Sequence, residues 1–132
     1  MPKGKVFTSS EYCTSMKDFQ KSFIGTSINS IEISAGTTSR TCSDSYVANK
    51  IVSAFSKCRD NSCYSKKYFT CQGHKWGVGD CGDGGEIMVG HTTVCSCSSK
   101  DVVIRPCIDN QHWGGSNDGC SESTTKLRIV VT

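Results

Sequence analysis

Two stretches in the first half of the chain repeat apolar residues at helical spacing. Residues 44–57 predict an amphipathic helix of about four turns with Ser43 or Asp44 as its N-cap. Its apolar stripe comprises Val47, Ile51, Ala54, Phe55 and Cys58. Residues 10–24 predict a first helix that ends before Gly25. Its stripe comprises Tyr12, Met16, Phe19 and Phe23.

Alternation of apolar and polar positions predicts strands in the rest of the chain. Residues 28–35 alternate, with Ile31, Ile33 and Ala35 on the buried face, and the turn residues from Gly36 onward end this strand. A hairpin is expected around Gln72-Gly73-His74, with Trp76 as a core residue. The short strands expected after the second helix lie near 67–72, 75–79, 85–89, 93–97, 101–105 and 126–131.

Two helices in the N-terminal half, followed by a run of short strands, predict an α+β fold in which the helices cover an antiparallel β-sheet. The chain has 132 residues, of which 36% are hydrophobic, and this is enough for one domain with a small core. We expect a single disulfide-rich domain, residues 1–132. Within it, residues 1–25 form an N-terminal helical arm and residues 26–132 form the α+β body.

Ten cysteines, an even number, indicate a disulfide scaffold made in an oxidising compartment. A helix over 44–57 would hold Cys42 and Cys58 about 20 Å or more apart, which is too far for a disulfide. Each must therefore bond to another element, and Cys71 is placed to tie its hairpin to a neighbour. We expect all ten to be oxidised: Cys13, Cys42, Cys58, Cys63, Cys71, Cys81, Cys95, Cys97, Cys107 and Cys120.

Charge and hydropathy narrow the range of partners. The net charge of +3 is too small to indicate nucleic acid. Basic residues do gather at Lys57, Arg59, Lys66, Lys67 and Lys75, which we interpret as a solvated face. No stretch approaches the roughly 20 apolar residues of a membrane span. The first residues lack the apolar run of a signal peptide, so a secreted protein is expected to be a mature chain behind an added methionine.

The most suggestive chemistry lies in residues 109–119, a polar, glycine-rich loop between Cys107 and Cys120, which we expect to be bonded to each other. Sugars are bound by a flat aromatic ring against their C–H face and by amides or carboxylates that pair with their hydroxyls. The alternative is a structural turn whose Trp113 covers a small core. The candidate ligand-binding residues are Asp109, Asn110, Gln111, His112, Trp113, Asn117 and Asp118.

Three further groups of residues are candidates for a metal site or a catalytic site. Asp80, Asp83 and Glu86 are spaced by three in a glycine-rich loop and could bind Ca²⁺, or form a solvated acidic turn. His74, His91 and His112, near Lys66, Lys67 and Lys75 in sequence, could serve an acid–base hydrolase, but nothing in their spacing shows that they converge. The cysteines form no CxxC pair, so neither structural zinc nor redox catalysis is expected. No cofactor is predicted.

In element order, residues 28–90 resemble the small secreted α/β killer toxins encoded by fungal viruses. The resemblance rests on a strand, a cysteine-flanked helix and returning strands; it has no diagnostic motif and carries over no residue role. The leading interpretation is a secreted, lectin-like binding module that engages glycans or glycoproteins on a cell, virus or matrix, with a defence or antiviral role. The alternatives are a toxin that binds a protein target such as a channel through the basic 57–67 segment, and a small secreted hydrolase such as a ribonuclease.

Overall fold

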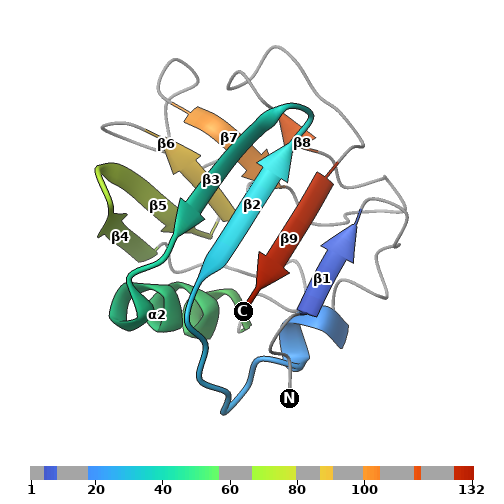
Figure 1. The fold of residues 1–132 in the computed structure, drawn as a ribbon, viewed down its shortest axis with the longest axis vertical. Helices are drawn as coiled ribbons and strands as arrows, with labels where there is room; N and C mark the ends of the chain where they lie inside the picture. Colours follow the sequence, from blue (N-terminus) through green and yellow to red (C-terminus); the bar gives the residue numbers. More distant parts are fainter. Residues whose placement is uncertain are drawn as a thin grey trace.

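The structure is a computed structural model that describes residues 5–8, 18–56, 67–79, 87–90, 100–104, 115–116 and 127–132. These residues form strands, one helix labelled α2, and a helical turn at 18–21 (Figure 1). The elements are β1 Lys5–Thr8, β2 Ile31–Ala35, β3 Thr38–Cys42, α2 Ser45–Ser56, β4 Lys67–Cys71, β5 His74–Val78, β6 Ile87–Gly90, β7 Lys100–Ile104, β8 Gly115–Ser116 and β9 Leu127–Val131.

The strands form two antiparallel sheets, where the sequence predicted one. One sheet has the order β1-β9-β2-β3 and the other β4-β5-β6-β7-β8. The C-terminal strand β9 lies between β1 and β2, so both ends of the chain join the first sheet. The mixed α+β class is therefore confirmed. The alternation of each segment predicts a strand, but it does not say which strands pair, and for this reason the division into two sheets was missed.

Most of the predicted helices and strands are present in the structure within a few residues of their expected bounds. Helix α2 matches the predicted 44–57, and Asp44 is its N-cap, because Asp44 Oδ1 accepts a hydrogen bond of 3.2 Å from Val47 N. The turn at 18–21 is the described part of the predicted helix 10–24, and the remainder lies outside the described residues. The predicted strand 93–97 also lies outside them.

Two hairpins differ in how well the sequence predicted them. In β4–β5 the turn is Gln72–Gly73, with φ of 53° and 84°, which is the mirror-image turn that suits a two-residue hairpin. His74 was predicted in that turn, but it is the first residue of β5 and pairs with Cys71 of β4. The second hairpin, β2–β3, was missed. Gly36, with φ of 63°, reverses the chain there and starts a polar strand where we expected only a turn.

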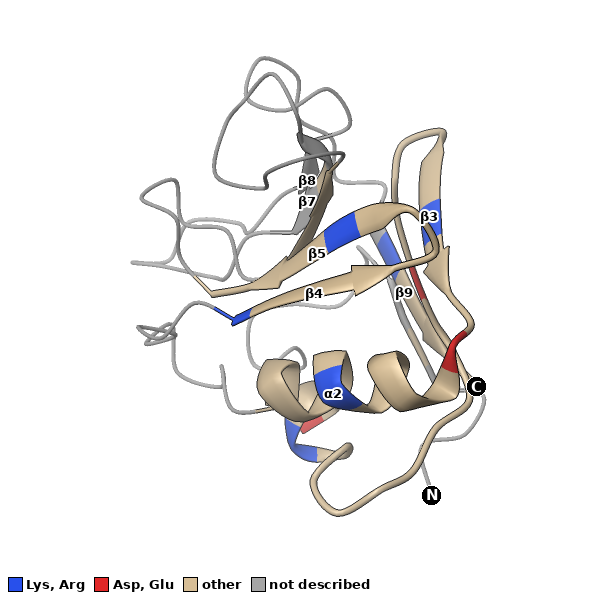
Figure 2. Ribbon diagram, turned by 90° about the vertical axis from the view of Figure 1, so that its left-hand side faces the viewer, with Lys and Arg blue, Asp and Glu red and all other residues tan. Residues whose placement is uncertain are grey.

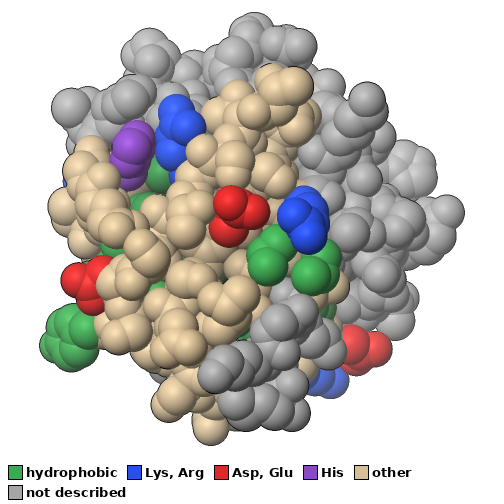
Figure 3. All heavy atoms as spheres, in the orientation of Figure 1, with side chains coloured by type: hydrophobic (Ala, Val, Ile, Leu, Met, Phe, Trp, Pro, Cys, Tyr) green, Lys and Arg blue, Asp and Glu red, His purple; other side chains and the backbone are tan. Residues whose placement is uncertain are grey.

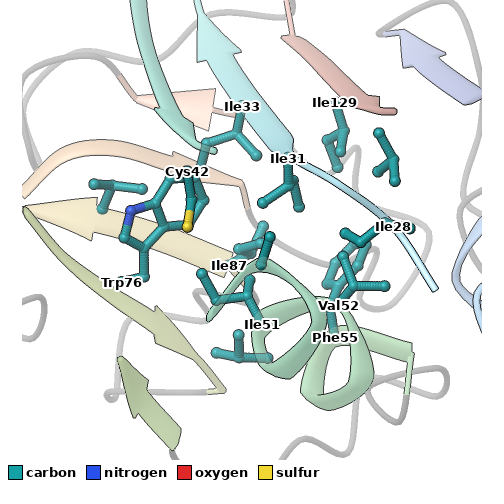
Figure 4. Close-up of a cluster of buried hydrophobic side chains, with 14 of the residues drawn as sticks. Ile28, Ile31, Ile33, Cys42, Ile51, Val52, Phe55, Trp76, Ile87 and Ile129 are labelled. Carbon is teal, nitrogen blue, oxygen red and sulfur yellow. The ribbon is translucent and has the colours of Figure 1, made fainter. Parts of the chain in front are cut away.

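The inner faces of both sheets and one face of α2 share a single core (Figure 4). Ile31 and Ile33 of the first sheet face Ile51 of α2, while Trp76 of the second sheet packs beside them. The helix is buried along the predicted stripe, with Ile51 and Phe55 fully buried and Val47 and Ala54 partly buried. Trp76 is fully buried, as predicted. Helix α2 thus closes one end of the space between the sheets (Figure 1).

The end of β3 is bonded to the end of β4 by the disulfide Cys42–Cys71, with Cα atoms 5.7 Å apart. This confirms that Cys42 does not pair with Cys58 and that Cys71 ties its hairpin to a neighbour. Closing a loop over 29 residues should stabilise the fold by roughly 3–4 kcal/mol in the chain-entropy description. The cysteines outside the described residues are Cys13, Cys58, Cys63, Cys81, Cys95, Cys97, Cys107 and Cys120.

Phe55→Ala tests the orientation of α2. Because Phe55 is fully buried between the sheets, its loss should leave a cavity and lower the free energy of unfolding by about 3–5 kcal/mol. Lys50→Ala, on the exposed face of the same helix, should lower it by no more than about 1 kcal/mol, through loss of its contact with the Tyr46 ring. Denaturant unfolding of both variants measures the difference, and equal midpoints would mean that the helix is oriented differently.

Candidate functional site

The predicted saccharide loop can be placed only through its centre. Gly115 and Ser116 form β8, which pairs with Val103 and Ile104 at the edge of the second sheet. That edge is opposite to β4, about 19 Å away across four strand spacings. The predicted ligand-binding residues of this loop lie outside the described residues: Asp109, Asn110, Gln111, His112, Trp113, Asn117 and Asp118.

The other predicted constellations are described only in part. The calcium candidates Asp80, Asp83 and Glu86 lie outside the described residues, as do His91 and His112. His74 is half-buried on β5. No three His, Cys, Asp or Glu side chains meet in a metal-binding group within the described ranges. In that part of the chain, no helix has the length and hydropathy needed to cross a membrane.

A groove of about 410 Å³ lies between the segment 23–27 and α2. This volume falls in the range of about 300–1,000 Å³ that is typical of ligand sites in proteins. Its described lining carries no charged side chain. Its lining includes Ile24, Thr26, Ser27, Asn49, Ser53 and Ser56.

Hydrogen bonds hold the walls of this groove together. Asn49 Oδ1 accepts from Ile28 N at 2.9 Å, and Asn49 Nδ2 donates to Ile28 O at 2.8 Å, so the segment after the groove is fixed to the helix. Ser56 Oγ donates to Ser53 O at 2.7 Å and keeps its lone pairs as acceptors. Within the described structure, the hydroxyls of Ser27 and Ser53 make no hydrogen bond. The groove therefore offers hydroxyl donors and acceptors on rigid walls.

One wall of the groove also offers an apolar contact. Ile24 is 56% exposed, although it directly follows Phe23, which is buried in the core. A partly exposed aliphatic side chain beside several hydroxyls matches the two kinds of surface on a sugar ring, its C–H face and its hydroxyl rim.

A second surface feature lies beside the groove, on α2 and the β4–β5 hairpin. Tyr46 and Tyr68 are 70% and 45% exposed, and each has a lysine ammonium over its ring. Lys50 Nζ lies 4.4 Å from the Tyr46 ring centroid, and Lys75 Nζ lies 4.9 Å from that of Tyr68. We call these four residues, together with exposed Lys67, the aromatic–basic face. Figure 2 shows its lysines on three neighbouring elements.

Helix geometry joins the groove to the aromatic–basic face. Tyr46, Lys50 and Ser53 stand at i, i+4 and i+7 and form one stripe along α2. Asn49, Ser53 and Ser56 have the same spacing and form the adjacent stripe, which lines the groove. Ser53 belongs to both stripes, so the two features are continuous along the helix.

Among the side chains described on β4, β5 and β6, the exposed ones lie on the β4–β5 hairpin. Tyr68 and Thr70 of β4 are exposed and point away from the core, because Phe69 and Cys71 point toward it. Farther across the same outer face, Met88 of β6 is buried. The open surface around Tyr68 therefore ends before β6.

The outer face of the first sheet has a different character. Figure 3 shows it as mostly backbone and uncharged polar atoms, with a small hydrophobic patch and a few charged side chains. Its acidic residue Glu32 accepts a hydrogen bond of 3.1 Å from Thr41 Oγ1 across the strand pair. The residues that line the groove belong to other elements. It therefore serves as a reference surface for substitutions outside the candidate site.

Sequence reasoning identified Lys67 and Lys75 as part of a basic, solvated face, but not the tyrosines, Lys50 or the residues of the groove. A signal was present in the spacing of Tyr46 and Lys50, which lie four residues apart on the polar side of the predicted helix. Another signal was the alternation along this strand, which places Tyr68 on the opposite face from Phe69 and Cys71. The groove itself had no such signal, because it depends on how segment 23–27 returns to α2.

No protein-family model, curated protein or solved structure matches the chain.

Trp113→Ala tests the predicted loop against its structural alternative. If Trp113 stacks on a sugar, the variant should lose at least about tenfold in saccharide affinity, as central aromatic contacts do, while its melting temperature is retained. If the side chain instead covers the core, the stability should fall by several kcal/mol. Trp76→Ala is the matched control, since Trp76 is fully buried and its loss should be seen first in unfolding. Wild-type binding by Trp113→Ala would reject the loop as a site.

Proposed function

We propose that this protein is a secreted, disulfide-stabilised carbohydrate-binding module with a lectin-like mode of action. The observation that carries the proposal is the uncharged, hydroxyl-lined groove of about 410 Å³ between segment 23–27 and α2. A groove of this size accommodates one or two sugar rings. Because its described lining has no charged side chain, the groove suits the neutral hydroxyls of a sugar.

The groove suits binding more than catalysis. In the described lining, the polar groups are serine and threonine hydroxyls and an amide, and none is a general acid or base. The Asn49 amide is engaged by Ile28 and by Ser45 O, which Asn49 Nδ2 contacts at 2.7 Å, so its role is to hold the walls. The hydroxyls of Ser27 and Ser53 are the groups that we assign to the ligand.

The loop at 109–119 is proposed as a separate saccharide contact, because β8 holds its centre at the sheet edge away from the groove. Two contacts on one small domain would allow the protein to bind a branched or repeating glycan more tightly than either contact alone. A defence or antiviral role would follow from binding such glycans on another cell or on a virus, without any catalytic step.

A toxin that engages a protein target is the second candidate function. The feature that favours it is the pair of exposed tyrosines, Tyr46 and Tyr68, since tyrosine is enriched at protein interfaces. Lysine is depleted at the same interfaces, and each of these rings has a lysine over it. The carbohydrate proposal therefore accounts for both the groove and the lysines, whereas the toxin proposal accounts only for the exposed tyrosines.

Ser53→Tyr tests the groove directly. Ser53 is an exposed helix residue in the groove wall, so a tyrosine there should obstruct the groove without disturbing the core. We expect binding on a glycan array to fall at least about tenfold, which corresponds to about 1.4 kcal/mol. The melting temperature should stay close to that of the wild type.

Ser39→Tyr is the matched control, because Ser39 is exposed on β3, away from the groove. It should bind the same glycans as the wild type. Binding that survives in Ser53→Tyr would reject the groove as the site, and a wild-type protein that binds no glycan would reject the function.

A further inference from the structure

We propose that the aromatic–basic face binds an acidic polysaccharide, one that carries uronate or sulfate groups along its length. This inference rests on the proposed carbohydrate-binding function and names the class of glycan. The observation behind it is that the face is continuous with the groove through Ser53, so that one glycan chain can contact both.

The charge of this face is open to a ligand. Lys50 and Lys67 are exposed and Lys75 is half-buried. None of the three forms an ion pair with a described residue. Three ammonium groups on neighbouring elements, without an ion-pair partner among the described residues, attract an anion, and a carboxylate or sulfate accepts strong hydrogen bonds from them.

The tyrosine rings give the lysines a defined position. An ammonium within about 6 Å of a ring centroid is attracted to the ring face, by about 0.5–1 kcal/mol at an exposed site. Both pairs meet that distance, and they lie on different elements, α2 for Tyr46 and Lys50, and the β4–β5 hairpin for Tyr68 and Lys75. The ammonium groups are thereby held against the protein surface, and less conformational entropy is lost when an anion binds.

A polysaccharide fits this face better than a nucleic acid does. Nucleic-acid sites present open aromatic rings on which bases stack, and here an ammonium lies over the rings of both Tyr46 and Tyr68. The net charge of +3 is also small for a protein that follows a phosphate backbone. Cations on neighbouring elements beside a groove lined with hydroxyls match a polysaccharide whose sugar rings carry both acidic groups and neutral hydroxyls.

The test is a binding titration of the full chain with four polymers: polygalacturonate, dextran sulfate, uncharged dextran and single-stranded DNA. In Lys50→Gln/Lys75→Gln, the affinity for polygalacturonate should fall at least about tenfold at low salt, and the salt dependence should weaken because fewer charges are engaged. Lys50→Arg/Lys75→Arg should keep the wild-type affinity, since arginine retains both the charge and the cation–π contact.

Tyr46→Leu/Tyr68→Leu tests the role of the rings, because it leaves every lysine in place. It should weaken polygalacturonate binding several-fold with an unchanged melting temperature. Polygalacturonate binding that survives the glutamine substitutions would overturn the proposal. DNA bound as tightly as polygalacturonate would also overturn it, since charge alone would then explain the binding.

The two proposals fail in distinguishable ways. If the groove assignment is wrong, Ser53→Tyr keeps its binding to neutral glycans, while the glutamine variant still loses polygalacturonate. If the face assignment is wrong, the glutamine variant keeps its affinity for polygalacturonate, while Ser53→Tyr still loses its affinity for neutral glycans.

Discussion

The disulfide between Cys42 and Cys71 is the constraint on which the described structure depends. It joins the last residue of β3 in one sheet to the last residue of β4 in the other, and both sulfurs belong to buried residues. The residues that directly follow the two cysteines are also hydrogen-bonded to each other, because Gln72 Oε1 accepts from Ser43 N at 2.9 Å. The two sheets are thus fixed to each other at the point where α2 begins.

This junction determines where the candidate site lies. Helix α2 starts three residues after Cys42 and buries Ile51 and Phe55 between the sheets, so its opposite side must face solvent. That side carries the groove wall and the Tyr46–Lys50 pair, and the same disulfide places the β4–β5 hairpin, with Tyr68 and Lys75, beside it. One side of α2 therefore packs in the core, while its other side forms part of the candidate site.

The sequence predicted those parts of the fold that depend on local pattern. The stripe of α2, its Asp44 cap and the Gln72–Gly73 hairpin follow from spacing and turn chemistry. Strand β3 was missed because its residues are polar apart from Cys42, and β1 was missed because it is a strand only through pairing with β9. Of the candidate site, the sequence indicated only the basic residues Lys67 and Lys75. The groove and the pairing of lysines with tyrosines were missed for the same reason, because both arise where separate segments or turns of the chain meet.

Nuclear magnetic resonance mapping with a uronate oligosaccharide tests the account most directly, because it reports every backbone amide in one titration. The account predicts perturbed amides along one continuous path, from Ser27 through Ser53 and Lys50 to Tyr68 and Lys75. Perturbations confined to the outer face of the first sheet, around Ser34 and Ser39, would contradict it.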